Sequence, residues 1–205
     1  DIGYKIAKQF GHHIYPTRAG LVPFTFSDQF KEVTTRLSGN AVEATLSNDL
    51  NSFTEALLFT HRGLSGPSSL QLSNYWNVGQ AFNINFLPSL ELFEFFKAKK
   101  QSQPKVLLRT LLIEHLPKSV VLELQNLIWA EWAETSIGQL SDEKLENIAH
   151  KLHQFEVKPS GTEGYRTAEV TLGGVDTTEV SSKTMESKKQ KGLFFIGEIL
   201  DVTGH

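Results

Sequence analysis

The sequence predicts an α+β fold in which a β-barrel-like subdomain is interrupted by a small helical bundle. Hydrophobic residues alternate with a period of two before residue 88 and again after residue 154, which is typical of strands with one buried face. Between these segments the period is close to that of a helix, and Gly138 is the only glycine. Because the flanking strands must pair across the inserted helices, residues 1–88 and 155–192 form one predicted subdomain and residues 89–154 another.

The composition is that of an ordinary globular chain. Its 205 residues are 40% hydrophobic and 21% charged, which excludes a disordered or fibrous protein. The net charge of -3 provides no general attraction to phosphate, so we expect no nucleic-acid partner. No apolar run approaches the roughly 18 residues of a membrane span, so we expect no membrane partner and a cytoplasmic location. The absence of cysteine excludes disulfides and thiol nucleophiles.

The first 88 residues predict a short helix followed mainly by strands. Two prolines in the extended stretch after this helix favour an edge strand or an irregular one. A polar turn at residues 47–49 favours a hairpin, and a proline begins the second helix. The predicted elements are a helix over residues 2–10, extended chain over 12–26, strands over 41–46 and 52–59, a helix over 68–75 and a strand over 82–86.

The helical block contains four amphipathic segments that can bury their apolar stripes against one another. The fourth has the clearest start, since Ser141 is a natural N-cap and the two acidic residues after it complement the positive helix end. The apolar residues of the four segments lie within 90–96, 106–111, 120–132 and 145–152.

The remaining chain predicts strands and one solvated loop. Strands are expected over residues 155–157 and 168–172, and the lysine-rich stretch 181–191 is expected to be exposed. The apolar run 193–202 resembles a buried parallel strand, which would deliver the carboxylate of Glu198 to a ligand at its carboxyl end.

Few residues in the sequence carry a recognisable catalytic pattern. The segment Gly63–Pro67 departs from the G-x-S-x-G pattern of serine hydrolases, and no phosphate-binding glycine loop occurs. We therefore assign no catalytic residue and no metal. Thr60, His61 and Ser65 surround these glycines and are candidates to contact an anion or a carbonyl group, although a structural hydrogen bond is the default role for His61.

Two glycine features, Thr171–Val175 and Gly192–Glu198, gain meaning in combination with other motifs. Together these motifs resemble the bacterial YhiN-type, aminoacetone-oxidase-like NAD(P)/FAD-dependent oxidoreductases. The matching stretches are Gly3-Tyr4, Ala7–His12, Leu21–Pro23, Leu58–His61, Gly63–Pro67, Thr171–Val175, Thr184–Ser187 and Gly192–Asp201.

The resemblance implies that the chain is the insert of a split FAD-binding protein and is inactive in isolation. Residues 193–205 would then be a strand of the FAD-binding domain, which would itself be the partner of the insert. The cofactor would be FAD in the intact protein, with NAD(P)H as a possible electron donor and a small molecule as substrate. The resemblance implies that Gly197, Glu198 and Asp201 lie against FAD, and that Thr171, Gly173, Gly174 and Val175 lie near the flavin or the substrate side. We therefore count Gly173, Gly174 and Val175 with the cofactor-binding candidates, and Thr171 with Thr60, His61 and Ser65 as substrate-side candidates.

The two ends of the sequence also favour the interpretation of the chain as a segment excised from a longer protein. The chain opens at Asp1 directly into a helical pattern, and it stops directly after the last apolar run.

The alternative function is a protein-interaction module that docks a partner through the helical bundle. Trp129 and Trp132 would be the anchors of that surface, although core packing explains Trp132 better because it continues the buried stripe of its helix.

Overall fold

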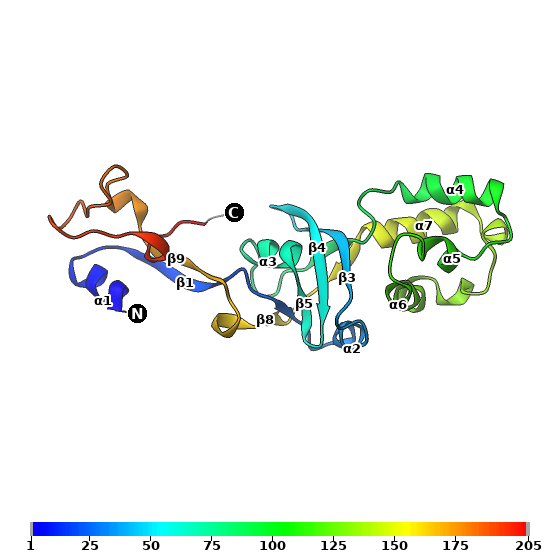
Figure 1. Cartoon of the computed structure of the whole chain (residues 1–205), viewed down its shortest axis with the longest axis horizontal. Coiled ribbons are helices and arrows are strands. Elements are labelled where there is room, and N and C mark those ends of the chain that lie inside the picture. Colours follow the sequence, from blue (N-terminus) through cyan, green and yellow to red (C-terminus); the bar gives the residue numbers. More distant parts are fainter. Residues whose placement is uncertain (1, 204–205) are drawn as a thin grey trace. The chain divides into compact units, whose positions relative to one another are not determined.

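The computed structural model describes residues 2–203, which divide into two compact units (Figure 1). Unit 1 joins the chain up to Val22 with the chain from Glu163 onward. Unit 2 comprises Pro23–Thr162.

Unit 2 contains an antiparallel sheet of seven strands in the order β7-β6-β3-β4-β5-β2-β8. The predicted hairpin at its centre is confirmed, with Ala41 opposite Leu58 and Ser47 opposite Ser52. The strands are β2 (Phe24–Thr25), β3 (Ala41–Ser47), β4 (Ser52–Thr60), β5 (Gly63–Ser65), β6 (Phe82–Asn85), β7 (Phe155–Val157) and β8 (Gly161–Thr162).

The strand residues alternate between core and surface, as their sequence requires. In β3, Val42, Ala44 and Leu46 are buried while the residues between them are more exposed. Among the described residues, β7 and β8 are the two edges of the sheet and do not pair with each other. The sheet is therefore open. The predicted α+β class is confirmed, but these strands do not close into a barrel.

Two helices accompany this sheet. The predicted helix after Gly66 is α3 (Pro67–Ser73), and the proline occupies its first turn. Sequence reasoning missed α2 (Gln29–Arg36), although its start is marked by Asp28, whose side chain accepts a hydrogen bond from the Phe30 N–H at 3.1 Å.

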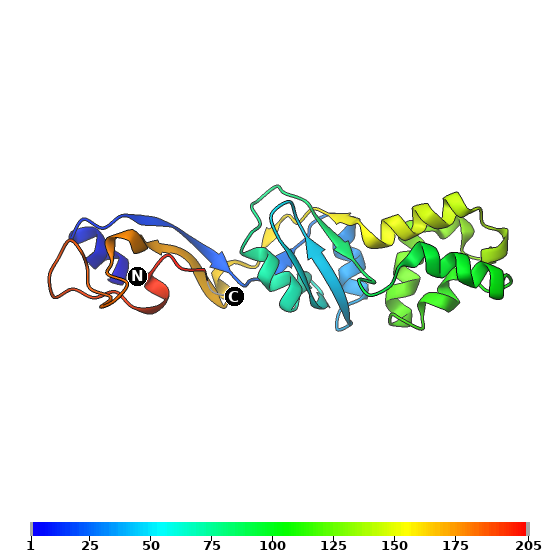
Figure 2. The ribbon, with the colours of Figure 1, turned by 90° about the horizontal axis from the view of Figure 1, so that it is seen from above.

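The helical bundle of unit 2 confirms the four predicted amphipathic segments (Figure 2). They are α4 (Leu92–Ser102), α5 (Leu108–Leu112), α6 (Lys118–Ile128) and α7 (Asp142–His153), with short 3₁₀ turns η1 (Ala130–Trp132) and η2 (Ile137–Gln139). Ser141 caps α7 as predicted and accepts a hydrogen bond from the Lys144 N–H at 3.3 Å. The bundle is joined to the sheet, because the Phe86 N–H donates to the Leu152 carbonyl at 3.1 Å and both sets of apolar side chains share one core.

The two tryptophans proposed as anchors of a docking surface have different environments. Trp129 is 1% exposed and belongs to the core, so it cannot anchor a partner. Trp132 is half-buried, and the Lys144 ammonium lies 4.7 Å from the centre of its ring.

Unit 1 is built on the antiparallel pair of β1 (Ile14–Gly20) and β9 (Val170–Val175). The predicted N-terminal helix is α1 (Ile2–Gln9), and three 3₁₀ turns follow, η3 (Gly164–Arg166), η4 (Thr177–Glu179) and η5 (Gly197–Ile199). A small core forms where α1 meets β9 and the C-terminal segment, residues 176–203. Its buried residues are Ala7, Val175, Val180 and Phe195.

The prediction of a buried strand over residues 193–202 is wrong. This segment contains η5 and two isolated bridges, a parallel one between Val175 and Leu200 and an antiparallel one between Glu186 and Phe194. Phe194 and Ile196 are 56% and 73% exposed. The positive φ of +73° at Gly197 interrupts the extended backbone, so apolar composition alone does not make a strand here. Gly204 and His205, at the end of the predicted segment, lie outside the described residues.

No helix within the described part of the chain combines the length and apolar character that crossing a bilayer demands.

Candidate functional site

The predicted FAD-contacting residues of β9 and the C-terminal segment come together in unit 1. The Asp201 N–H donates to the Val175 carbonyl at 2.9 Å, and the Thr171 N–H donates to Glu198 Oε1 at 2.6 Å. These bonds hold η5 and the chain after it along β9, so residues almost thirty positions apart form one surface.

Gly173 and Gly174 serve the packing of this surface rather than forming an open cradle. Both have positive φ, +80° and +136°. A Cβ atom on Gly173 would overlap the Pro16 carbonyl of β1, and one on Gly174 would lie 2.5 Å from the Ile199 carbonyl oxygen. The space in front of each glycine is thus filled by the unit's own backbone.

A pocket with a volume of about 400 Å³ opens beside this surface. It lies within unit 1 and is of a size that accommodates a small ligand or one base. Its lining residues come from α1, β1, η3, β9 and η5: Tyr4, Thr17, Tyr165, Thr171, Glu198 and Ile199.

The electrostatics of the pocket keep its inner phenol neutral. Burial raises the pKa of Tyr4 above its ordinary value, and the nearby Tyr165 hydroxyl and Glu198 carboxylate raise it further. Tyr4 is half-buried, whereas Tyr165 is 60% exposed. The pocket therefore presents two phenols, two threonine hydroxyls and one carboxylate.

The other predicted substrate-side residues belong to unit 2 and build the turn between β4 and β5. The Thr60 hydroxyl oxygen accepts from the Arg62 and Gly63 N–H groups at 3.3 and 3.1 Å and donates to the Gly63 carbonyl at 3.2 Å. The His61 carbonyl accepts a hydrogen bond from the Thr35 hydroxyl at 3.2 Å, and His61 is an exposed residue. Ser65 is half-buried in β5. These contacts shape the turn, and the substrate-side role stays a prediction.

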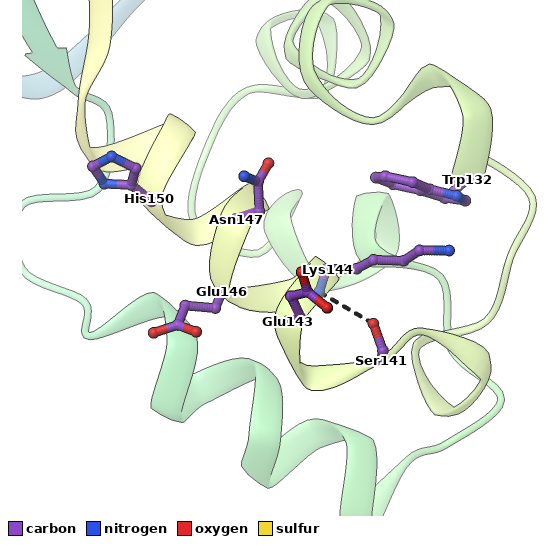
Figure 3. Close-up of a pocket in the computed structure, with 7 residues that line it drawn as sticks. All are labelled: Trp132, Ser141, Glu143, Lys144, Glu146, Asn147 and His150. Carbon is purple, nitrogen blue, oxygen red and sulfur yellow. Dashed lines mark hydrogen bonds between the residues drawn. The ribbon is translucent and has the colours of Figure 1, made fainter.

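A second, larger hollow of about 740 Å³ lies on the helical bundle (Figure 3). Figure 3 shows side chains from α7 and Trp132 around it, with the cap between Ser141 and the Lys144 N–H at its rim. Glu143 and Glu146 line this hollow beside Lys144, so its charge is mixed. In residues 2–203, no three His, Asp or Glu side chains are grouped so that they could hold a metal ion.

Sequence reasoning missed Tyr4, Thr17 and Tyr165 as pocket residues. Tyr4 lies within one of the stretches that carry the family resemblance, Gly3-Tyr4, but its spacing in the sequence gives no reason to place it beside Glu198. Only the packing of α1 against β9 brings the two together.

These residues do not form a complete site for FAD. Gly173 and Gly174 face the unit's own backbone, and the sequence has no glycine loop of the kind that grips a pyrophosphate. The open space beside Gly197, where a Cβ atom would meet nothing within 4 Å, is the only one of the three glycine positions that leaves room for a ligand.

Comparison with known proteins identifies the family. The model of the HI0933-like protein barrel and H2TH domain matches residues 18–170. The chain belongs to the HI0933-like family. Two relatives, both called ribosomal RNA dihydrouridine synthase, are 49% identical over 98% of the chain in Escherichia coli and 47% identical over 98% in Haemophilus influenzae. A more distant relative, 27% identical over 98% of the chain, is the 3-dehydro-bile acid delta(4,6)-reductase of Clostridium scindens.

The HI0933-like relatives are longer than this chain. It spans 50% of each ribosomal RNA dihydrouridine synthase and 52% of the bile acid reductase.

These relatives correct several expectations from the sequence. The interpretation as an inactive insert fragment of a YhiN-type oxidoreductase is wrong, because the identity with ribosomal RNA dihydrouridine synthases extends over nearly the whole chain. The HI0933-like family is nevertheless a related family of flavoproteins. The exclusion of nucleic acid as a partner is also wrong, since these relatives act on ribosomal RNA.

The error about nucleic acid has a physical reason. A net charge of -3 averages over the whole chain and does not describe local patches. Residues 183–191 of unit 1 form a stretch of nine residues with four exposed lysines, Lys183, Lys188, Lys189 and Lys191.

Proposed function

We propose that this protein takes part in the reduction of uridine to dihydrouridine in ribosomal RNA. The observation that carries the proposal is the identity of 49% and 47% with two ribosomal RNA dihydrouridine synthases over 98% of the chain. Identity at this level over both units supports a shared substrate class.

The more distant relative supports the chemistry independently of RNA. The name of the bile acid delta(4,6)-reductase also describes the reduction of carbon–carbon double bonds, in a molecule that carries a 3-oxo group. In uracil, the C5–C6 double bond is likewise conjugated with a carbonyl group, at C4. In uracil, hydride adds to C6 and a proton adds to C5, next to the C4 carbonyl. In both molecules the double bond is reduced by hydride addition at the end of a conjugated system that the carbonyl group activates.

The reduction needs an electron donor, for which we propose FAD, reduced in turn by NADH or NADPH. FAD is the hydride donor that the flavoprotein relationship favours, and flavin chemistry supplies hydride transfer. Since Gly173 and Gly174 offer no phosphate cradle, we assign no residue of this chain to the FAD phosphates.

The RNA substrate requires positive charge on the protein surface. The lysine-rich stretch of residues 183–191 in unit 1 supplies it, since all four of its lysines are exposed. Two of these ammonium groups are held by carbonyl groups of unit 1, Lys188 by Thr178 and Lys189 by Gly11, at 2.8 and 2.6 Å. Lys189 also forms an ion pair with Glu179, so its charge is shared with that carboxylate. We also propose a cytoplasmic location, where an enzyme of this kind would meet ribosomal RNA.

The test is deletion of the gene in the organism that encodes the protein, followed by mass spectrometry of nucleosides from purified ribosomal RNA. We expect dihydrouridine to disappear from at least one position and to return when the full gene is restored. Unchanged dihydrouridine in the deletion strain would contradict the proposal, and reduction of a steroid enone by the purified protein would then favour a small-molecule substrate.

A further inference from the structure

The pocket of unit 1 presents the groups that the reduction of uracil requires from a protein. Addition of hydride at C6 leaves a negative charge shared between C5 and the C4 oxygen, and a proton must then reach C5. The group that donates this proton must be protonated at neutral pH and must lie in a pocket that can hold the base. A donor from this chain cannot be a thiol, because the chain contains no cysteine.

Two side chains of the pocket meet the protonation requirement, Tyr4 and Tyr165. Glu198 is a carboxylate on an exposed residue that already accepts the Thr171 N–H at 2.6 Å, so it serves as an acceptor. Thr17 and Thr171 have aliphatic hydroxyls, which are far weaker acids than a phenol and suit hydrogen bonding to the uracil carbonyls.

Burial distinguishes the two phenols. Tyr165 is 60% exposed on η3, where water competes for its hydroxyl. Tyr4 is half-buried on α1, where less water reaches its hydroxyl, and burial together with Tyr165 and Glu198 raises its pKa above the ordinary value. The packing of α1 against β1 and β9 fixes the helix that carries it.

We propose that Tyr4 is the catalytic acid that protonates C5 of the uracil base, with Thr17 and Thr171 as its neighbours in the base pocket. This inference rests on the proposed function. A hydride from a reduced two-electron carrier forms the new C6–H bond, and the π electrons of the C5–C6 bond move toward C5 and the C4 carbonyl. The Tyr4 O–H bond then breaks, its proton forms the C5–H bond, and the phenolate regains a proton from water.

The experiment compares the full-length enzyme with its Tyr4→Phe variant in single-turnover reduction of ribosomal RNA, started with pre-reduced enzyme. We expect the rate of dihydrouridine formation to fall by about 10²-fold or more, in the range of a lost general acid, with RNA affinity unchanged. The matched control is Tyr15→Phe, which removes a 42% exposed phenol of β1 outside the pocket and should leave the rate unchanged.

A pH profile separates a catalytic role from a structural one. The wild-type rate should decline at alkaline pH as Tyr4 loses its proton, and fluorotyrosine at position 4, a stronger acid of nearly the same size, should move this decline to lower pH. The fluorotyrosine result also decides the question if the phenylalanine variant fails to fold. A profile that does not move, or a Tyr4→Phe variant with wild-type rate, would overturn the role of Tyr4.

Failure of this inference is distinguishable from failure of the proposed function. A wild-type enzyme that forms no dihydrouridine contradicts the function itself. A wild-type enzyme that is active together with an equally active Tyr4→Phe variant contradicts only the assignment of the acid, and a large loss in Tyr165→Phe alone would transfer the role to that residue.

Discussion

His12 Nε2 lies 2.7 Å from the hydroxyl oxygen of Ser187, which is 175 residues away in the sequence. The Ser187 oxygen already accepts the N–H groups of Lys189 and Gln190 at 3.0 and 2.9 Å, so its own proton points to His12. On the other side of the ring, Nδ1 lies 3.1 Å from Glu179 Oε2, although the atoms are not aligned as a hydrogen bond. The imidazole is fully buried, and it ties the end of α1 to the C-terminal segment.

This arrangement is structural rather than catalytic. Ser187 is 7% exposed, and it does not line the pocket of unit 1. We expect Ser187→Ala to destabilise unit 1 by about 1–3 kcal/mol, because it leaves His12 Nε2 and two backbone N–H groups without a partner in a buried place. Amide hydrogen exchange over residues 2–22 and 163–203 measures this, since all three tryptophans lie in unit 2 and fluorescence would not report it.

The control for this prediction is Ser182→Ala, which changes an exposed serine five residues away. Its effect on exchange should be within about 0.5 kcal/mol. Equal protection in the Ser187→Ala and Ser182→Ala variants would show that the buried hydrogen bond contributes nothing.

Unit 1 should also lose stability in acid through Glu179. The Lys189 ammonium holds the pKa of this carboxyl below its usual range, against the effect of burial, and the His13 N–H adds to the lowering. Because the folded-state pKa is lowered, the stabilisation is complete above the ordinary glutamate value of about 4.3 and is lost as the pH falls through the lower folded value. Hydrogen exchange of unit 1 at pH 6 and pH 3 measures the loss, and Glu179→Gln should make it smaller.

The glycines of unit 1 should differ sharply in their tolerance of a side chain. Gly174→Ala places a Cβ atom 2.5 Å from the Ile199 carbonyl oxygen at a φ of +136°, so we expect a loss of about 3 kcal/mol or more from overlap and strain. Gly197→Ala has a φ of +73° but meets nothing within 4 Å, so its cost should stay near 1 kcal/mol. Hydrogen exchange of unit 1 ranks the two variants, and equal losses would contradict the packing role of Gly174.

The helical bundle depends on the buried stripe of α7. Ile148 is fully buried in the core that joins the bundle and the sheet, and Ile148→Ala should lower the free energy of unfolding by about 2–5 kcal/mol. Urea denaturation followed by tryptophan fluorescence measures it, because Trp129 reports directly on this core. Glu146→Ala on the exposed face of α7 is the matched control and should change stability by no more than about 0.5 kcal/mol.

Local patterns in the sequence predict most of the secondary structure because each depends on neighbouring residues. The cap of Ser141, the alternation of Val42, Ala44 and Leu46, and the hairpin turn after residue 46 each follow from spacing within a few positions. The segment 193–202 breaks this rule, since its apolar residues suggest a strand and only the backbone turn at Gly197 and the exposure of Ile196 show otherwise.

The candidate site could be predicted only in part. The stretches around Thr171 and Glu198 stand out in the sequence, but only the structure shows that a hydrogen bond of 2.6 Å joins them. Tyr4 and Thr17 come from other elements, and no spacing rule places a residue of α1 beside a carboxylate nearly two hundred positions later.

By itself the sequence determined the α+β class and the positions of the central hairpin and of every α-helix except α2. Only the tertiary structure decided that the seven-stranded sheet stays open, that His12 meets Ser187, and that Tyr4 and Glu198 share a pocket. The physical reason is that helix and strand patterns arise from short-range repeats, whereas pockets and buried polar contacts arise where distant segments pack together.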